Sequence, residues 1–368
     1  MAMNRVPTSK PRNMRRTLSK ALPTSAVLTG RRLPAFRRAL LRWYDEHRRD
    51  LPWRQTRDPY RIWLSEIMLQ QTRVNAVLNH YRIFLERFPT VEALATAPED
   101  AVLAAWSGLG YYRRARRLLQ CAKEIVLLHR SLFPQRAEDL LKLPGVGRYT
   151  AAALASIAFD EPVAVVDGNV ERVLRRLLGL PLTPLQTWPH AQSLLARSRP
   201  GDFNQAMMEL GATVCLPREP RCAVCPVRRW CVTQPSPAVG RAITMERRAS
   251  PPANSPRSSA LRQVKKEIWC ALSQRNSRVR LVQRSRKASL MPGMWELPQS
   301  SEPPRLSQAA AQGRTFRHSI TVTDYTVHVL QNLPLASNAQ GKWIGIERLS
   351  QIPITGLTRK ILSASGII

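Results

Sequence analysis

Apolar side chains recur at helical spacing along the first two thirds of the chain. Leu33, Phe36, Leu40 and Tyr44 lie three or four positions apart, which predicts an amphipathic helix over 33–44. The same spacing predicts helices over 62–78, 81–87, 91–95, 99–106, 115–128, 137–143, from 148 onward, 170–178, 188–198 and 203–215. No stretch before residue 235 alternates with period two. This part of the chain is therefore predicted to be all-α.

The pattern changes after a segment rich in Pro, Ser, Ala and Arg. Residues 235–262 show no periodicity, which is typical of a linker. Beyond it, β-branched or alternating residues predict strands over 267–273, 278–283, 318–322 and 325–330, and helical spacing predicts helices over 306–312 and 357–364. We therefore expect a disordered basic tail (1–32), a helical domain (33–234), a linker (235–262) and a small α+β domain (263–368).

A short turn with two glycines separates two of the predicted helices. In Pro144-Gly145-Val146-Gly147, glycine allows a tight turn whose backbone N–H groups point outward, and the next helix adds the positive end of its dipole. Such a turn suits a phosphate. Asp167 follows twenty positions after Gly147, at the end of an apolar run. A carboxylate in this setting indicates chemistry on a nucleic acid.

The charge balance agrees with a polyanionic partner. The formal net charge is +32, and the first 44 residues hold eleven Lys or Arg and no Asp or Glu. An anionic membrane is the weaker interpretation, because no apolar run approaches the ~18 residues of a membrane helix and no amphipathic anchor is evident. An Arg-rich proteome would also explain the charge. A mitochondrial transit peptide is the alternative interpretation of residues 1–32, which lack the apolar segment of a secretory signal.

Most of the cysteines are crowded into one short stretch. They are Cys215, Cys222, Cys225 and Cys231. Without a secretory signal we expect a reducing compartment, so a metal site is favoured over a disulfide framework. Zinc sites of four cysteines usually show two C-x2-C pairs, whereas one pair with intervals of six, two and five favours a [4Fe–4S] cluster held by a single loop. Cys121 and Cys270 lie far away and are expected to be core residues.

Two further segments admit a functional and a structural interpretation. Glu66 lies in LSEIMLQQT (64–72), where periodicity alone favours a surface position, although a buried carboxylate there could carry a proton at neutral pH. GLGYYRRARR (108–117) combines a flexible turn, stacking surfaces and phosphate charge, and a helix cap with core tyrosines is the alternative.

Taken together, these motifs resemble those of the adenine DNA glycosylases of the MutY type, in the helix-hairpin-helix superfamily. The resemblance covers residues 33–368 and rests on the four cysteines and on DLPWR (50–54), LSEIMLQQT (64–72), GLGYYRRARR (108–117), LPGVGRYTAAA (143–153), VDGNVERVL (166–174) and FNQAMMELGA (203–212). It implies a six-helix barrel with an iron–sulfur module, followed by a Nudix-like domain marked by LMPGMWELP (290–298) and TFRHSITVTDY (315–325).

The resemblance also implies a pair of catalytic carboxylates. Glu66 matches the general acid that protonates N7 of the flipped adenine, and Asp167 matches the charged carboxylate that stabilises the oxocarbenium-like sugar and bonds transiently to its C1′. Tyr149 and Asn169 match residues that position the aspartate and the sugar. Related bifunctional endonucleases carry a lysine at the position of Tyr149. A phenol cannot form a Schiff base, so we expect base removal without efficient strand cleavage.

The remaining site residues follow from the same match. Arg54 and Gln205 would line the adenine pocket, and Gln70, Gln71 and Tyr111 would enter the duplex and offset the cost of unstacking. The backbone N–H groups that would hold phosphates belong to Gly145, Val146 and Gly147.

In this family the C-terminal domain recognises 8-oxoguanine opposite the adenine. Many members have Phe-Ser-His where this chain has Ile320-Thr321-Val322, so Thr321 keeps the hydroxyl while the aromatic wedge and the imidazole are absent. The neighbouring side chains that could substitute are Arg317, His318, Thr323 and Tyr325. The module lacks the Glu-rich helix of a Nudix hydrolase, so no pyrophosphatase activity is expected.

The expected partner is double-stranded DNA that contains adenine opposite 8-oxoguanine or guanine, and we expect a monomer that does not bind membranes. The expected location is the bacterial cytoplasm with its nucleoid, or the nucleus or mitochondrion if the basic tail is a targeting segment. The rival interpretations are a thymine glycosylase for G:T mismatches and a non-enzymatic iron–sulfur protein that binds DNA.

Overall fold

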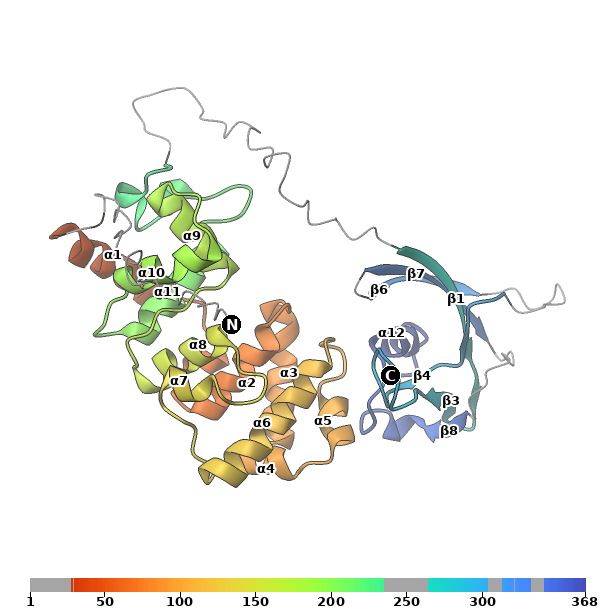
Figure 1. Ribbon diagram of the computed structural model, residues 1–368. Coiled ribbons are helices and arrows are strands. Elements are labelled where there is room, and N and C mark those ends of the chain that lie inside the picture. The colour runs from red at the N-terminus through yellow and green to blue at the C-terminus, as the bar shows by residue number, and fades with distance from the viewer. Residues whose placement is uncertain (1–27, 29, 235–263, 304–312, 321, 332–340) are drawn as a thin grey trace, which may run out of the picture. The chain divides into compact units, whose positions relative to one another are not determined.

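The computed structural model describes residues 28, 30–234, 264–303, 313–320, 322–331 and 341–368 (Figure 1). Its contacts divide the chain into two compact units, Met1–Arg48 with Pro162–Ser236 and Arg49–Glu161 with Pro237–Ile368. The chain thus leaves the first unit, builds the helical part of the second, and then returns. The predicted linker (235–262) and nearly all of the predicted tail (1–32) lie outside the described residues.

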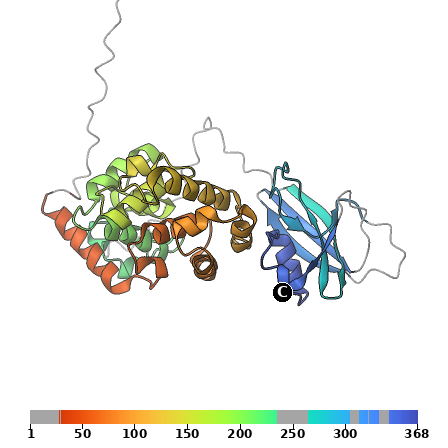
Figure 2. The same ribbon diagram turned by 90° about the horizontal axis from the view of Figure 1, so that it is seen from below.

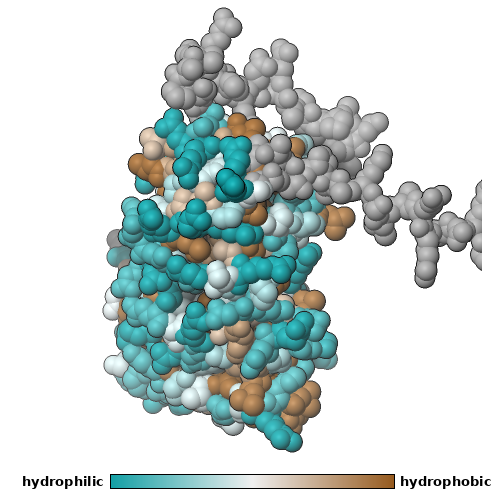
Figure 3. Space-filling view, turned by 90° about the vertical axis from the view of Figure 1, so that its left-hand side faces the viewer, coloured by the Kyte–Doolittle hydropathy of each residue, from teal (hydrophilic) through white to brown (hydrophobic). Residues whose placement is uncertain are grey.

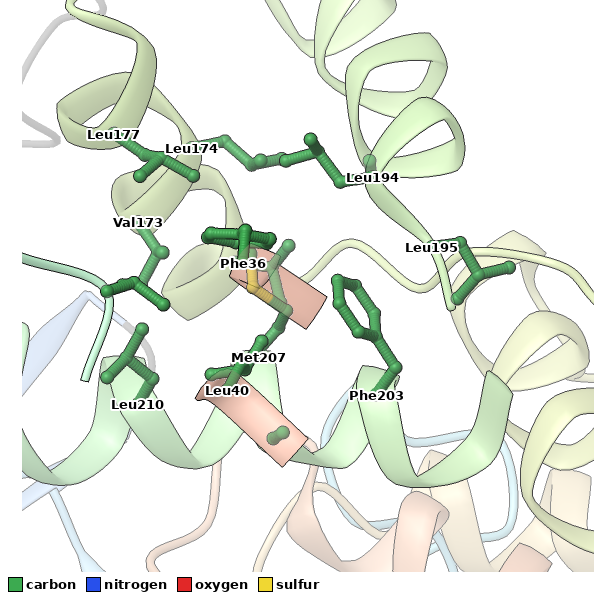
Figure 4. Packing of buried hydrophobic residues seen from close by; sticks show 14 of the residues in the cluster. Phe36, Leu40, Val173, Leu174, Leu177, Leu194, Leu195, Phe203, Met207 and Leu210 are labelled. Atoms are coloured by element: carbon green, nitrogen blue, oxygen red, sulfur yellow. The ribbon is translucent and has the colours of Figure 1, made fainter. Parts of the chain in front are cut away.

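The described part of the first unit is helical, as the apolar spacing predicts. Its helices are α1 (Arg32–His47), α9 (Gly168–Leu178), α10 (Pro184–Leu194) and α11 (Pro200–Thr213), followed by 3-10 turns at Cys222–Val224 and Arg228–Trp230. Figure 4 shows their apolar side chains meeting around Phe36. The ring of Phe36 packs edge-on against Trp230 at 5.7 Å and against Phe203 at 6.4 Å. Burial of these faces holds the four helices together.

The first part of the second unit is also helical. It contains a 3-10 helix at Pro52–Arg54 and helices α2 (Pro59–Leu69), α3 (Val74–Arg87), α4 (Val91–Thr96), α5 (Glu99–Ala105), α6 (Arg113–His129), α7 (Ala137–Leu140) and α8 (Arg148–Phe159). The single helix predicted over 62–78 is wrong. Helix α2 ends at Leu69, Gln71 adopts a left-handed backbone (φ 57°), and α3 begins at Val74. Apolar residues continue on both sides of this break, so periodicity does not reveal it.

Strands occupy the C-terminal part of this unit, as predicted. They are β1 (Val264–Leu272), β2 (Gln274–Arg275), β3 (Arg278–Gln283), β4 (Trp295–Glu296), β5 (Gln299–Ser300), β6 (Arg314–Ile320), β7 (Thr323–Gln331) and β8 (Lys342–Gly345). One sheet has the order β5-β1-β7-β6, with β1 and β7 parallel, and the other has the order β2-β3-β4, with β8 beside β3. The predicted helix over 306–312 lies outside the described residues.

Helix α12 (Gly356–Ala364) completes the core of these two sheets. Both Figure 1 and Figure 2 show it beside the strands. Its Ile361 and Leu362 are fully buried with Val279 of β3 and Val327 of β7. The predicted helix over 357–364 is therefore confirmed, and its apolar stripe is the face that the sheets cover.

One face of the described chain is largely polar (Figure 3). Hydrophilic residues predominate on the face shown in Figure 3, and hydrophobic ones are scattered among them. Scattered apolar residues of this kind are normal on a protein surface. None of the helices in the described ranges is both long enough and apolar enough to span a membrane.

Candidate functional site

A buried carboxylate lies inside α2. Asp58 accepts a hydrogen bond from the Tyr60 N–H at 2.9 Å and so caps the start of this helix, and apolar side chains on all its sides are buried. Glu66 is only 6% exposed. The surface position that periodicity favours is therefore wrong. Within α2 only Arg61 is exposed and the residues on all other sides are enclosed, so the amphipathic pattern does not locate Glu66.

The phenol of Tyr149 reaches this carboxylate from α8. Its O–H donates to Glu66 Oε2 at 2.7 Å. Nearby, the side-chain amide of Gln70 donates to the buried Thr150 Oγ1 at 3.3 Å, which ties the end of α2 to the first turn of α8. The structure thus brings together Glu66 and Tyr149, which lie 83 positions apart.

The glycine turn precedes α8, as predicted. Gly145 has φ 78°, and a Cβ there would lie 2.8 Å from the Cβ of Arg117, so only glycine fits without a shift. No side chain caps α8 at Gly147, so the helix start keeps the positive end of its dipole for an anion. The N–H of Val146 donates to Leu143 O at 3.2 Å and is thus engaged within the turn.

In the first unit, Asp167 is the N-cap of α9. Its Oδ1 accepts from the Val170 N–H at 2.7 Å, and its Oδ2 accepts from the Asn169 amide at 2.8 Å. Asn169 Oδ1 in turn accepts from Arg172 Nη2 at 2.9 Å, and Arg172 Nε donates to Cys215 O at 2.9 Å. A continuous set of hydrogen bonds therefore connects Asp167 with the beginning of the cysteine-rich loop.

The extended run before Asp167 is held by two side-chain amides. Asn204, 2% exposed, accepts from the Val165 N–H at 3.0 Å and donates to Val163 O at 2.9 Å. Gln192 accepts from the Ala164 N–H and donates to Pro162 O, both at 2.8 Å. Neither amide is among the residues predicted from the sequence. Asn204 could have been noticed as a polar residue next to Phe203 in the apolar face of a predicted helix.

The predicted pocket residues occupy half-buried positions. Gln205 lies on α11 of the first unit, next to Asn204. Arg54 ends the 3-10 helix of the second unit, and its Nη1 donates to Arg49 O at 3.1 Å. Each side chain is thus anchored by an ordered element of its own unit.

Two exposed side chains stand on strained turns of the second unit. Gln71 is exposed, and Tyr111 is 56% exposed with φ 49°. Tyr112, in contrast, is 6% exposed, so the core-tyrosine interpretation holds for Tyr112 and not for Tyr111. Non-glycine residues in left-handed conformations are uncommon and are enriched at functional sites, and Gln71 and Tyr111 are two of the eight in the described chain.

The four clustered cysteines are free and half-buried, whereas Cys121 and Cys270 are fully buried, as predicted. Arg176 links two of the clustered ones, because its Nη1 donates to Cys215 Sγ at 3.3 Å and its carbonyl accepts from Cys231 Sγ at 3.4 Å. Burial, followed by the charges of the other thiols, raises the pKa of Cys225 to about 11. In the part of the chain that the structure describes, no three His, Cys, Asp or Glu side chains form a closed metal-ligand set.

The predicted lesion-recognition residues lie on β6 or just beyond it. Arg317 is exposed, and its carbonyl accepts from Lys360 Nζ at 2.9 Å. Burial, and secondly the charge of Lys360, lowers the pKa of His318, which pairs with Tyr325 of β7. Thr321 lies outside the described residues.

Comparison with protein families gives one match. Residues 64–195 match the model described as "HhH-GPD superfamily base excision DNA repair protein". This range includes Glu66, the glycine turn, Tyr149 and Asp167. Gln205 and the four cysteines lie beyond it.

Comparison with individual proteins points in the same direction. The chain is 50% identical over 212 residues to an adenine DNA glycosylase of Rattus norvegicus, covering 54% of this chain and 41% of the relative. It is 44% identical over 227 residues to one of Arabidopsis thaliana, covering 53% and 36%. A solved thermostable thymine-DNA glycosylase is 31% identical, with a TM-score of 0.52, and the match covers 55% of this chain and 95% of that chain. The chain spans less than half the length of the two adenine glycosylases.

Proposed function

The chain belongs to the HhH-GPD superfamily of base excision DNA repair proteins, and we propose that it hydrolyses the N-glycosidic bond of adenine mispaired with 8-oxoguanine or guanine. The observation that carries this proposal is a pair of carboxylates in unlike surroundings. Glu66 is buried with a phenol as its donor, whereas Asp167 is a half-buried helix cap with two donors. Glycosidic cleavage uses such a pair, one group as an acid and the other as an anion.

In the proposed reaction, protonated Glu66 transfers its proton to N7 of the extrahelical adenine. The C1′–N9 bond breaks, its electron pair goes to the base, and adenine leaves as a neutral molecule. The Asp167 carboxylate stabilises the positive charge that develops on the sugar and bonds transiently to C1′. Water then attacks C1′, the bond between C1′ and Asp167 breaks with its electron pair returning to the carboxylate, and a proton of that water restores Glu66. Asn169 and Tyr149 hold the two carboxylates in place.

The residue at the start of α8 limits the reaction to base removal. Tyr149 occupies the position at which a lysine would supply an amine for a Schiff base with C1′. A phenol cannot form that intermediate, so the strand should stay intact until alkali is added.

The identity of the base rests on the named relatives. Adenine DNA glycosylases are up to 50% identical to this chain, which supports adenine as the substrate. The thymine-DNA glycosylase, 31% identical and almost fully covered, supports thymine opposite guanine as a second candidate. We favour adenine because the identity is higher and because the half-buried amide of Gln205 can donate to and accept from the edge of adenine.

We also propose a [4Fe–4S] cluster on Cys215, Cys222, Cys225 and Cys231. Thiolates are the donors that such clusters use, all four residues are free, and three of them pack on the same core. Binding would draw the sulfur atoms together, because metal binding is coupled to local folding. When bound, the cluster would act as a structural centre, while Arg172 would transmit the position of Cys215 to the helix that Asp167 caps. Purified protein should be coloured and contain roughly four irons per chain. A colourless zinc protein would refute this proposal.

The C-terminal strands are proposed to form a Nudix-like module that recognises the base opposite adenine. Ile320 and Thr323 flank the turn at the end of β6, and Arg317, three residues before the end of that strand, is exposed. Because the aromatic wedge and the imidazole are absent from this turn, we expect a smaller preference for 8-oxoguanine over guanine than in relatives that carry them.

The test of the proposed function uses three duplexes, with adenine opposite 8-oxoguanine, adenine opposite guanine, and thymine opposite guanine. Each is incubated with the protein, and half of each reaction is then treated with alkali. We expect alkali-dependent cleavage at adenine only. Cleavage at thymine alone would establish the second candidate, and cleavage without alkali would contradict the role of Tyr149.

A further inference from the structure

A single half-buried guanidinium joins two turns of the second unit. Nη1 of Arg114, near the start of α6, donates to Ile67 O and Met68 O at 2.9 Å and also to Gln70 O. Its Nη2 donates to Thr72 Oγ1 at 3.1 Å, and to Leu109 O and Gly110 O at 3.3 Å. The guanidinium thus binds the end of α2 through Nη1, and through Nη2 it binds both Thr72, just after α2, and the 109–110 turn.

The bonds of Arg114 fall next to both strained residues. Gln70 O precedes Gln71, and Gly110 O precedes Tyr111. Gln71 and Tyr111 are both non-glycine residues with left-handed backbones, at φ 57° and 49°. Such a conformation is unfavourable for a residue with a side chain and persists only where neighbouring contacts fix the peptide. Arg114 supplies such a contact to both.

The surroundings of Arg114 suit a cation without any acidic partner. The oxygens that it binds in the described chain are carbonyl and hydroxyl oxygens, and three of the carbonyls belong to the C-terminal end of α2, where the helix dipole is negative. Its Cζ lies 5.4 Å from the ring centre of Trp106 and 5.3 Å from that of Tyr111. Burial lowers its pKa to about 10, so it still carries a charge at neutral pH.

We propose that Arg114 is a positioning residue that holds the Gln71 and Tyr111 turns as one rigid wedge for opening the duplex. This inference rests on the proposed function, since the wedge serves to expel the target base. The planar fork reaches two separate turns at once, whereas a lysine ammonium is a single point of charge and can hold only one of them well.

The test compares Arg114→Lys with Arg82→Lys, which makes the same exchange at an exposed arginine of α3. Adenine release is measured in single turnover on a guanine-opposed substrate. Base expulsion is followed by the fluorescence of 2-aminopurine in place of the adenine, which rises when the base unstacks. Circular dichroism and thermal melting establish that both variants are folded.

We expect Arg114→Lys to bind duplex nearly as the parent does but to slow adenine release at least about tenfold, the effect of losing one charged hydrogen bond of about 1.4 kcal/mol. The increase in 2-aminopurine fluorescence should become smaller in parallel, and Arg82→Lys should leave both the rate and the fluorescence unchanged. A substrate with adenine opposite an abasic site, which is easier to unstack, should restore most of the rate.

A double-mutant cycle separates a wedge from general support of the fold. In a protein that carries Gln71→Ala and Tyr111→Ala, adding Arg114→Lys should have little further effect on 2-aminopurine fluorescence. An equal loss in both backgrounds, or unchanged fluorescence with Arg114→Lys alone, would overturn the inference. If Arg114→Lys does not fold, Thr72→Val replaces it, because this variant removes one hydrogen bond of the guanidinium. It must then lower adenine release and 2-aminopurine fluorescence together, by a smaller factor.

The proposed function and this inference can fail separately. A parent protein that releases no adenine contradicts the function. The wedge is tested by the ratio of 2-aminopurine fluorescence between variant and parent, and this ratio can be measured whether or not the base is then released.

Discussion

Replacing Asp167 by Asn and by Ala should separate the two roles of this carboxylate. As the N-cap of α9 it accepts one bond from the Val170 N–H at 2.7 Å and one from the Asn169 amide at 2.8 Å. As the proposed stabiliser of the sugar it supplies a negative charge. Asn keeps the oxygen that accepts from the Val170 N–H, but it loses the charge and turns an N–H group toward the Asn169 amide. Ala loses both hydrogen bonds and the charge.

The bonds give the size of the expected changes in stability. Loss of an N-cap costs about 1 kcal/mol, and loss of a half-exposed hydrogen bond costs about 1 kcal/mol more. The free energy of unfolding should therefore fall by about 1 kcal/mol in Asp167→Asn and by about 2 kcal/mol in Asp167→Ala. The charge matters in the transition state, so both variants should lose at least about 100-fold in the rate of adenine release.

Urea unfolding gives the first quantity, and single-turnover release of adenine gives the second. Binding to a duplex with an uncleavable adenine analogue serves as the control, because Asp167→Asn should bind as the parent does. If Asp167→Asn released adenine at the parental rate, the proposed role of the charge would be wrong. Equal stability of the Asn and Ala variants would refute the capping argument.

Three further predictions follow from other contacts. Tyr149→Phe removes the donor that holds the Glu66 carboxylate, so the single-turnover rate of adenine release should fall roughly tenfold, the effect of one lost hydrogen bond to a charged group. An unchanged rate would contradict this. The hydrogen bond from Arg199, first among its causes, lowers the pKa of Asp45 below 3.8, so this pair stabilises the fold above about pH 4 and ceases to do so as the pH falls through the lower folded-state pKa. Asp45→Asn should therefore lower the melting temperature near neutral pH and leave it unchanged in strong acid, and an equal loss at both would refute the assignment. Gly145→Ala should destabilise the protein by about 1–3 kcal/mol and weaken duplex binding, measured by melting and by titration, because its φ is 78° and its Cβ would collide with α6. Parental stability would show that the turn can relax.

Elements whose spacing agrees with their packing could be predicted from the sequence. α1 and α12 each bury one stripe, so their apolar periods give their positions to within a few residues. The break between α2 and α3 could not be predicted, because Ile67, Met68, Val74 and Val77 keep helical spacing across it. Part of what fixes the break is Arg114, which lies more than forty positions further along the chain.

The candidate site divides in the same way. Motifs that carry chemistry, such as the glycine turn and Asp167, are local and could be read directly. The burial of Glu66 depends on the enclosure of the whole of α2, which no window of the sequence records. The amides of Gln192 and Asn204 hold the backbone of Ala164 and Val165, which lie far from them in the sequence. Only the folded chain therefore shows their role.

The order in which the chain builds its first unit has a consequence for synthesis. α1 packs on α11 and is joined to it by Asp45 and Arg199, which lie 154 positions apart. At a synthesis rate of about 5–20 residues per second, α1 leaves the ribosome roughly 8–30 s before its partner exists. During that time the face that carries Phe36 and Leu40 is exposed to water. A nascent chain of this protein should therefore engage a chaperone at α1 and release it only after residue 213 has emerged.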